Sequence, residues 1–179
     1  MHPRRTIRQF DAFLAARGLH FEATVIGGAA LGLLGVTSRQ TRDADILQPE
    51  LPPKVRAAAR EFAMRHREAG ETLADEWLNN GASSLAKDLP AGWEQRLQPA
   101  FDGHALTLHT LGRGDLLMSK LFALCDRGID LPDCVALAPT AAELREVLPW
   151  LEQRDANADW PAHVRDVLAD MERRLGHGL

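Results

Sequence analysis

The sequence predicts an α/β (α+β) fold, in which helices flank a small mixed sheet and a helical extension follows. Three observations predict it. Short alternating or β-branched segments occur near residues 21–26, 43–47 and 104–111. Apolar residues between these segments recur at helical spacing. The pattern beyond residue 112 is helical, so we expect an α/β core over 1–112 and a helical extension over 113–179, packed on the core as one compact unit.

The first half of the chain alternates between helical and strand patterns. A helical pattern begins near residue 7 and stops at Gly18. The strand over 21–26 leads into two glycines, and residues 29–34 form a short apolar helix. The strand over 43–47 ends before a group of prolines, and one face of an amphipathic helix follows over 55–66. These elements alternate as expected for a sheet covered by helices.

The second half of the chain begins with a segment that shows no clear periodicity, residues 70–103. A strand over 104–111 and a helix over 115–127 come next. Thr140 and Glu143 have the spacing of a capping box, in which each side chain accepts a hydrogen bond from a backbone N–H at the start of a helix. An amphipathic helix with an apolar stripe from Val164 to Leu175 closes the chain.

Composition narrows the class of protein. The chain has 179 residues, of which 45% are hydrophobic and 26% charged, which excludes disordered and fibrous proteins. Lys and Arg number 21 against 25 Asp and Glu, so the net charge is −4. A dedicated nucleic-acid or anionic-membrane binder is normally basic, so these roles are disfavoured as the main one.

The sequence also predicts a cytoplasmic protein without a membrane partner. Apolar runs stay below the roughly 18 residues that a membrane span needs, and no signal-peptide core follows the N-terminal arginines. Cys125 and Cys134 fit neither a disulfide framework nor the spacing of a zinc site. We therefore expect two core thiols in a reducing compartment.

Two glycines directly follow the first strand. Gly27 and Gly28 would let the backbone approach a ligand closely, and the helix behind them offers unpaired N–H groups that favour an anion. The dinucleotide fingerprint and the P-loop pattern are both absent, because Ala29 and Leu33-Leu34 stand at their required positions. By itself the glycine pair is more typical of a structural tight turn.

Two carboxylates are placed on the second strand. Asp43 and Asp45 alternate with Ala44 and Ile46, so both aspartates point to one face of the strand and the apolar residues to the other. Like charges held together favour a cation, and paired carboxylates suit Mg²⁺. The alternative is a solvated strand edge, where the aspartates pair with neighbouring arginines.

The combination of these features resembles the nucleotidyltransferase superfamily related to polymerase beta, and more narrowly the AbiEii-type toxin branch and its uncharacterised relatives. The resemblance spans about residues 22–137. It rests on the run Gly27-Gly28-Ala29-Ala30-Leu31, then Gly35, then Arg39, Thr41, Asp43 and Asp45, and further along on Asp115-Leu116, Lys120-Leu121, Asp126-Arg127 and Asp133.

The resemblance implies a role for each matching residue. Asp43 and Asp45 would be catalytic and would bind Mg²⁺ (or Mn²⁺) together with an NTP. The nucleotide-binding residues would be Gly27, Gly28, Arg39, Thr41, Lys120 and Arg127. Lys120 and Arg127 lie two helical turns apart and share a face; the alternative is a solvated basic stripe, or a salt bridge from Arg127 to Asp130 or Asp133. Trp77 with Asn79 and Asn80 either frames a base pocket or packs in the core.

The sequence departs from the family in one respect. Active members usually carry a third acidic residue on a neighbouring strand, which helps to bind metal and to activate the attacking hydroxyl. The strand near residues 104–110 carries His104, Thr107 and His109 but no carboxylate. We expect this strand to lie beside the one that carries Asp43 and Asp45, so that one of its three polar residues is nearest to the pair and a histidine stands in for the acid. The alternative is a third acid from elsewhere: Asp102, Glu71, Asp75 or Glu76.

Two functions follow from these features. The first is metal-dependent transfer of a nucleoside monophosphate from an NTP to an RNA such as tRNA, to a protein or to a small molecule, in a toxin–antitoxin or phage-defence setting with a cognate toxin or antitoxin partner. The alternative is a catalytically weak nucleotide-binding or protein-interaction module, antitoxin-like, with the same fold.

Overall fold

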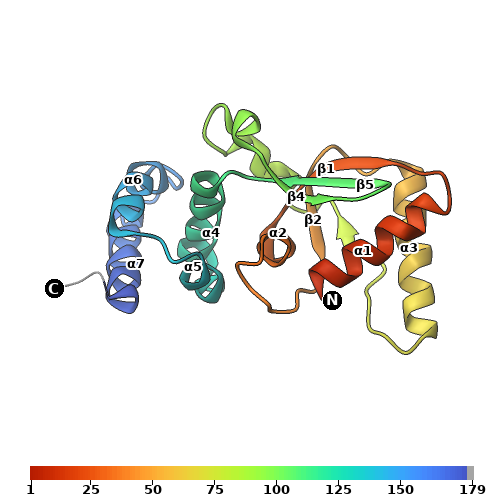
Figure 1. The fold of residues 1–179 in the computed structure, drawn as a ribbon. Coiled ribbons are helices and arrows are strands. Elements are labelled where there is room, and N and C mark those ends of the chain that lie inside the picture. Colours follow the sequence, from red (N-terminus) through yellow and green to blue (C-terminus); the bar gives the residue numbers. More distant parts are fainter. Residues whose placement is uncertain (177–179) are drawn as a thin grey trace. The chain divides into compact units, whose positions relative to one another are not determined.

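The computed structural model describes residues 1–176, and its contacts divide the chain into two compact units. The first unit runs from Met1 to Gly112 and the second begins at Arg113. The first unit contains all the strands among the described residues, and the second is helical (Figure 1). The predicted α/β fold with a small mixed sheet is therefore confirmed.

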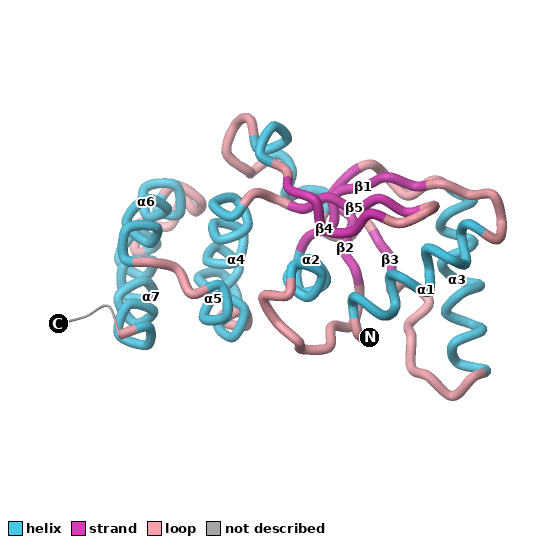
Figure 2. Tube along the Cα trace, viewed as in Figure 1, coloured by secondary structure: helices cyan, strands magenta, loops and turns pink. Residues whose placement is uncertain are grey.

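The sheet of the first unit has five strands in the order β3-β2-β1-β5-β4 (Figure 2). The central strand β1 pairs antiparallel with β2 and parallel with β5. The outer strands β3 and β4 pair parallel with β2 and antiparallel with β5, respectively. The strands are β1 (Phe21–Ile26), β2 (Ala44–Gln48), β3 (Leu78–Asn79), β4 (Gln98–Asp102) and β5 (Leu106–Thr110).

Three helices cover one face of this sheet. They are α1 (Pro3–Ala15), α2 (Gly27–Leu34) and α3 (Pro53–Glu68). Their apolar side chains form one core with alternate residues of the strands, such as Val25, Ile46 and Leu108, all of which are buried. Because side chains alternate along a strand, the residues between them, including Glu22, Asp45 and His109, face the opposite side of the sheet.

The unpredicted segment 70–103 contains several short elements. It includes β3, β4 and two 3₁₀ helices, Ser83–Lys87 and Trp93–Arg96. A buried aspartate of α1, Asp11, fixes the turn between β4 and β5. Its carboxylate accepts hydrogen bonds from the backbone N–H groups of His104, Ala105 and Leu106 at 2.8–3.2 Å. Burial alone would raise the pKa of Asp11, but these bonds outweigh it and lower the pKa.

The second unit is built from α4 (Arg113–Arg127), α5 (Leu131–Leu137), α6 (Ala141–Glu152) and α7 (Trp160–Leu175). The predicted capping box of Thr140 and Glu143 is present at the start of α6. Cys125 and Cys134 are buried free thiols, and burial raises their pKa values to about 11 and about 12. Within residues 1–176, no helix combines the length and the apolar character that crossing a bilayer requires.

Candidate functional site

The site begins where β1 passes directly into α2. Gly27 is the first residue of the helix and has a φ of +71°, a backbone conformation that residues other than glycine rarely adopt. A Cβ atom at Gly27 would lie 3.2 Å from Oδ2 of Asp45, and one at Gly28 would lie 3.2 Å from Oγ1 of Thr41. The glycine backbone is therefore in close contact with both side chains.

The acidic strand is held beside these glycines by the sheet. In the antiparallel pairing of β1 and β2, Asp45 stands opposite Ile26, the residue before Gly27. Ala44 and Ile46 are fully buried in the core, so Asp45 faces the other side, where it is half-buried. Asp43 lies two residues earlier, just before β2, and is half-buried as well.

The loop that joins α2 to β2 is anchored at several points. The N–H of Thr41 donates to the carbonyl of Met1 at 3.0 Å, and the Gln40 side chain meets the His2 ring at 2.9 Å. The Thr41 hydroxyl donates to the carbonyl of Asp43 at 3.2 Å. These contacts fix Thr41 beside Gly28. Arg39 belongs to the same loop and is exposed.

The acidic strand β2 lies between β1 and β3, which corrects our expectation that the strand near residues 104–110 lies beside it. That strand, β5, pairs with β1, so β1 separates it from β2. His109 lies opposite Thr24 of β1, and its Nδ1 is 3.8 Å from Oε1 of Glu22. A histidine of β5 is therefore not the neighbour of Asp45. The expectation was wrong because the order of strands in a sheet cannot be deduced from the sequence of one strand.

The residue that β3 places beside Asp45 is an amide. Asn79 stands opposite Asp45 in the parallel pairing of β2 and β3. Its Oδ1 accepts a hydrogen bond from the N–H of Gly81 at 2.6 Å, so the side chain closes a local turn. Trp77 is fully buried, and its Nε1 donates to the carbonyl of Ala59. Of the two alternatives for Trp77, packing in the core is therefore correct. No strand pattern in the sequence indicated this two-residue strand.

The residues present fit a single hard cation. Magnesium is commonly bound through one or two carboxylates and the phosphates of a substrate. Asp45 provides one carboxylate on β2, and Asp43, two residues earlier, provides a second just before the strand. Across residues 1–176, no three or more His, Cys, Asp and Glu side chains are grouped as metal ligands. The donor set therefore suits a cation that arrives with a nucleotide.

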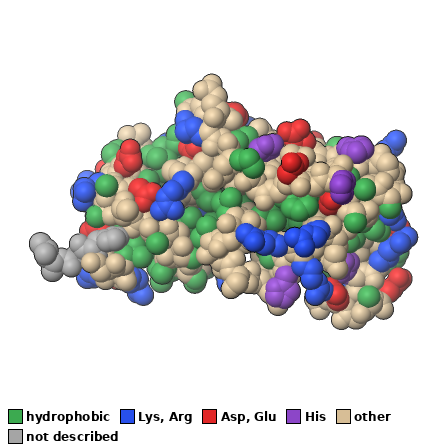
Figure 3. All heavy atoms as spheres, in the orientation of Figure 1, with side chains coloured by type: hydrophobic (Ala, Val, Ile, Leu, Met, Phe, Trp, Pro, Cys, Tyr) green, Lys and Arg blue, Asp and Glu red, His purple; other side chains and the backbone are tan. Residues whose placement is uncertain are grey.

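Basic side chains surround the α1 end of the first unit (Figure 3). Arg4, Arg5 and Arg8 are exposed along this helix. Arg4 donates to the carbonyls of Gly32 and Leu33 in α2 at 3.2 and 3.1 Å, and Arg5 pairs with a glutamate. Arg4 thus binds carbonyls at the C-terminal end of α2, the opposite end of the helix from the glycine turn.

Lys120 and Arg127, the other two predicted nucleotide-binding residues, lie in the second unit. Lys120 is buried and its Nζ is 2.7 Å from Oδ2 of Asp133 and 3.2 Å from Oδ1 of Asp130. Arg127 is exposed and meets Asp130 at 3.4 Å. Both cations are thus paired with carboxylates of the second unit. For Arg127 this pairing with Asp130 agrees with the salt-bridge alternative given above. Their role in nucleotide binding stays a prediction.

The glycine turn and the acidic strand, placed together on a small mixed sheet, define a nucleotidyltransferase-like fold. The family comparison agrees with this class. The model of a family described as "Nucleotidyltransferase of unknown function (DUF6036)" matches residues 5–136, and the chain belongs to this family. No curated protein and no solved structure matches the chain. This match supports membership in the nucleotidyltransferase superfamily, whereas membership in the AbiEii-type branch stays a prediction.

Proposed function

We propose that the protein transfers a nucleoside monophosphate from an NTP to an acceptor hydroxyl or phosphate, with Mg²⁺ or Mn²⁺ bound alongside the nucleotide. The observation that carries this proposal is the close approach of the Asp45 carboxylate and the Thr41 hydroxyl to the glycine backbone at the start of α2. This approach brings metal ligands and phosphate ligands together in one place, as a metal–nucleotide complex requires.

Each part of the site has a separate task in this proposal. The backbone N–H groups of Gly27 and Gly28 bind the triphosphate, which the positive end of the α2 dipole also favours. Thr41 and Arg39 hold a phosphate oxygen or orient the acceptor. Asp43 and Asp45 hold the cation, which when bound neutralises charge on the phosphates and on the leaving group. The anchored loop keeps these groups in position before the nucleotide arrives.

The proposed reaction is an in-line displacement at the α-phosphorus. A bond forms between the acceptor oxygen and this phosphorus, the bond from the α-phosphorus to the bridging oxygen of the β-phosphate breaks, and pyrophosphate leaves with the electron pair. A hydroxyl acceptor releases its proton to solvent. The acceptor is an RNA, a protein or a small molecule, and the resemblance to AbiEii-type toxins supports a toxin–antitoxin or phage-defence setting with a cognate partner.

A second candidate is a catalytically weak nucleotide-binding or protein-interaction module. The amide of Asn79, which occupies the position beside Asp45, favours this function. A neutral amide adds no negative charge with which to hold a second cation or to draw a proton from the acceptor. A protein of this kind would bind NTP without transferring the nucleoside monophosphate.

The experiment that separates the two functions is pyrophosphate release. The full-length protein is incubated with each of the four NTPs, Mg²⁺ or Mn²⁺, and a whole-cell extract of RNA and protein. The transferase predicts metal-dependent pyrophosphate release and label incorporation, both lost in the Asp43→Ala, Asp45→Ala double variant. Nucleotide binding without pyrophosphate release from any NTP would favour the binding module.

A further inference from the structure

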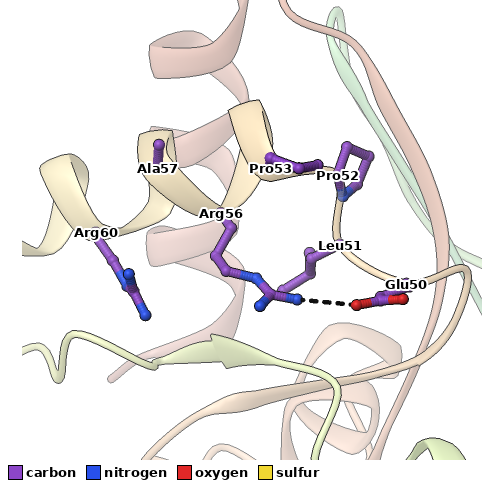
Figure 4. A pocket seen from close by; sticks show the side chains of 7 residues that line it. All are labelled: Glu50, Leu51, Pro52, Pro53, Arg56, Ala57 and Arg60. Atoms are coloured by element: carbon purple, nitrogen blue, oxygen red, sulfur yellow. Dashed lines mark hydrogen bonds and ion pairs between the residues drawn. The ribbon is translucent and has the colours of Figure 1, made fainter.

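A cavity of about 530 Å³ opens beside the start of α3, away from the glycine turn. Residues 50–53 form one side of it, and Arg56, Ala57 and Arg60 of α3 form the other (Figure 4). Its volume lies within the range of pockets that bind small organic molecules. Leu51, the two prolines and Ala57 give it an apolar wall next to two cations.

The two arginines have the arrangement that a phosphate requires. Arg56 and Arg60 are four residues apart, so they project from the same face of α3, and in Figure 4 both extend toward β3. A guanidinium offers paired N–H donors that match two oxygens of a phosphate. No acidic residue occupies the first turn of α3, so the helix dipole adds attraction of the same sign.

The present partners of both arginines are exposed glutamates. Arg56 meets Glu50 at 3.5 Å, and the Glu50 side chain is 84% exposed. The Nε of Arg60 meets Glu76 at 2.9 Å, and the Glu76 side chain is 57% exposed. Exposed ion pairs of this kind contribute little stability, so a phosphate can replace the glutamates. Glu50 still lines the cavity after it has released Arg56, and its negative charge favours a single phosphate group over a triphosphate.

The cavity is tied to the acidic strand by β3. Asn80 accepts a hydrogen bond from the N–H of Leu51 at 2.8 Å and donates to the carbonyls of Ile46 and Pro49 at 3.0 and 3.1 Å. The preceding residue, Asn79, stands beside Asp45. The edge strand β3 contacts both α3 and β2, so it joins the helix of the cavity to the acidic strand.

We propose that this cavity is the subsite for a phosphate ester of a nucleotide acceptor, with the phosphate on Arg56 and Arg60 and the nucleoside against the apolar wall. The proposal rests on the proposed transfer function and names the acceptor class for it. A nucleotide bound here would reach Asp45 around the edge strand β3, because Asp45 faces the side of the sheet opposite to α3. The phosphate ester belongs either to a mononucleotide or to an oligonucleotide.

The test measures binding alone, by calorimetry without NTP or divalent metal. The probes are inorganic phosphate, AMP and a short single-stranded oligoribonucleotide. We expect the wild-type protein to bind AMP or the oligonucleotide more tightly than inorganic phosphate, and the Arg56→Gln, Arg60→Gln variant to lose about tenfold or more in affinity. The control Arg65→Gln, Arg67→Gln removes the same charge from the same helix and should keep wild-type affinity.

The tighter of the two nucleotide probes identifies the source of the phosphate ester, and either result supports the proposal. Unchanged affinity in the Arg56→Gln, Arg60→Gln variant would overturn it, as would equal affinity for inorganic phosphate and AMP or binding of none of the probes. Binding of NTP and metal at Asp45 is measured separately. Its failure would refute the transfer function and would leave the measured affinity for AMP or the oligonucleotide unchanged.

Discussion

At the scale of single residues, the site depends on two glycines at positions where a side chain would crowd the neighbouring residues. Gly27 and Gly28 face Asp45 and Thr41 at distances that leave little room for a Cβ atom. The two glycines and Asp45 were predicted from their spacing around the strands, and Thr41 from the resemblance to the nucleotidyltransferase superfamily. The sequence did not predict that Asn79 stands beside Asp45, because this position depends on strand pairing and not on local pattern.

The Gly28→Ala variant tests the glycine turn directly. The new methyl group would lie 3.2 Å from Oγ1 of Thr41, so the hydroxyl must move by a few tenths of an ångström. We expect the free energy of unfolding to change by less than about 1 kcal/mol, and NTP affinity to fall about tenfold because the methyl covers the backbone N–H groups. Chemical denaturation and a nucleotide-binding assay measure the two effects.

The matched control is Gly114→Ala, since a Cβ atom there meets nothing within 4 Å. It should leave NTP affinity unchanged. Wild-type NTP affinity in Gly28→Ala would remove the glycine pair from the nucleotide site.

At the scale of the elements, helix ends and ion pairs define the second unit. Glu143 caps α6 and accepts a hydrogen bond from Nε of Arg113 at 2.6 Å. Arg113 also donates to the carbonyl of Leu137 at 3.0 Å, so it links the start of α4 to the end of α5. The bond from Arg113, together with that from the Thr140 N–H, lowers the pKa of Glu143 to about 2.

This lowered pKa predicts a pH dependence of stability. The ionised carboxylate stabilises the folded state fully above its ordinary pKa of 4.5, and the contribution is lost as the pH falls toward about 2. Glu143→Gln should therefore lower stability at pH 7 by about 1–2 kcal/mol, after allowance for solvent screening. Its difference from wild type should shrink between pH 4.5 and pH 2, as followed by circular dichroism.

The control for this prediction is Glu146→Gln, which changes an exposed glutamate on the same helix. A difference between Glu143→Gln and wild type that stays constant from pH 7 to pH 2 would contradict the assigned role of the ionised carboxylate.

The elements also show where sequence patterns are informative. The strands β1, β2 and β5 were predicted, because each is long enough for alternation or β-branching to be visible. The strand β3 has two residues and therefore no period, and β4 contains Pro99 and an irregular register next to it. Neither the sheet order nor the partners of Lys120, which come from the following turn and α5, can be deduced from local spacing.

At the scale of the whole molecule, the chain combines an α/β unit that carries the glycine turn and the acidic strand with a helical unit that begins at Arg113. The family model matches residues 5–136 and thus extends from the first unit into the second. We infer that the first unit binds an NTP with a divalent cation at Asp43 and Asp45. A ligand that binds only the folded state must raise its melting temperature, so this claim can be measured without knowledge of the acceptor.

The most direct measurement is the shift in melting temperature caused by each NTP with Mg²⁺ or Mn²⁺, in wild type and in the Asp45→Asn variant. Asp166→Asn, which changes an exposed residue of α7, is the control. We predict a metal-dependent increase for wild type and the control, and none for Asp45→Asn, whose ligand-free protein stays folded. An equal increase in Asp45→Asn, or no increase in wild type with any NTP, would contradict the account.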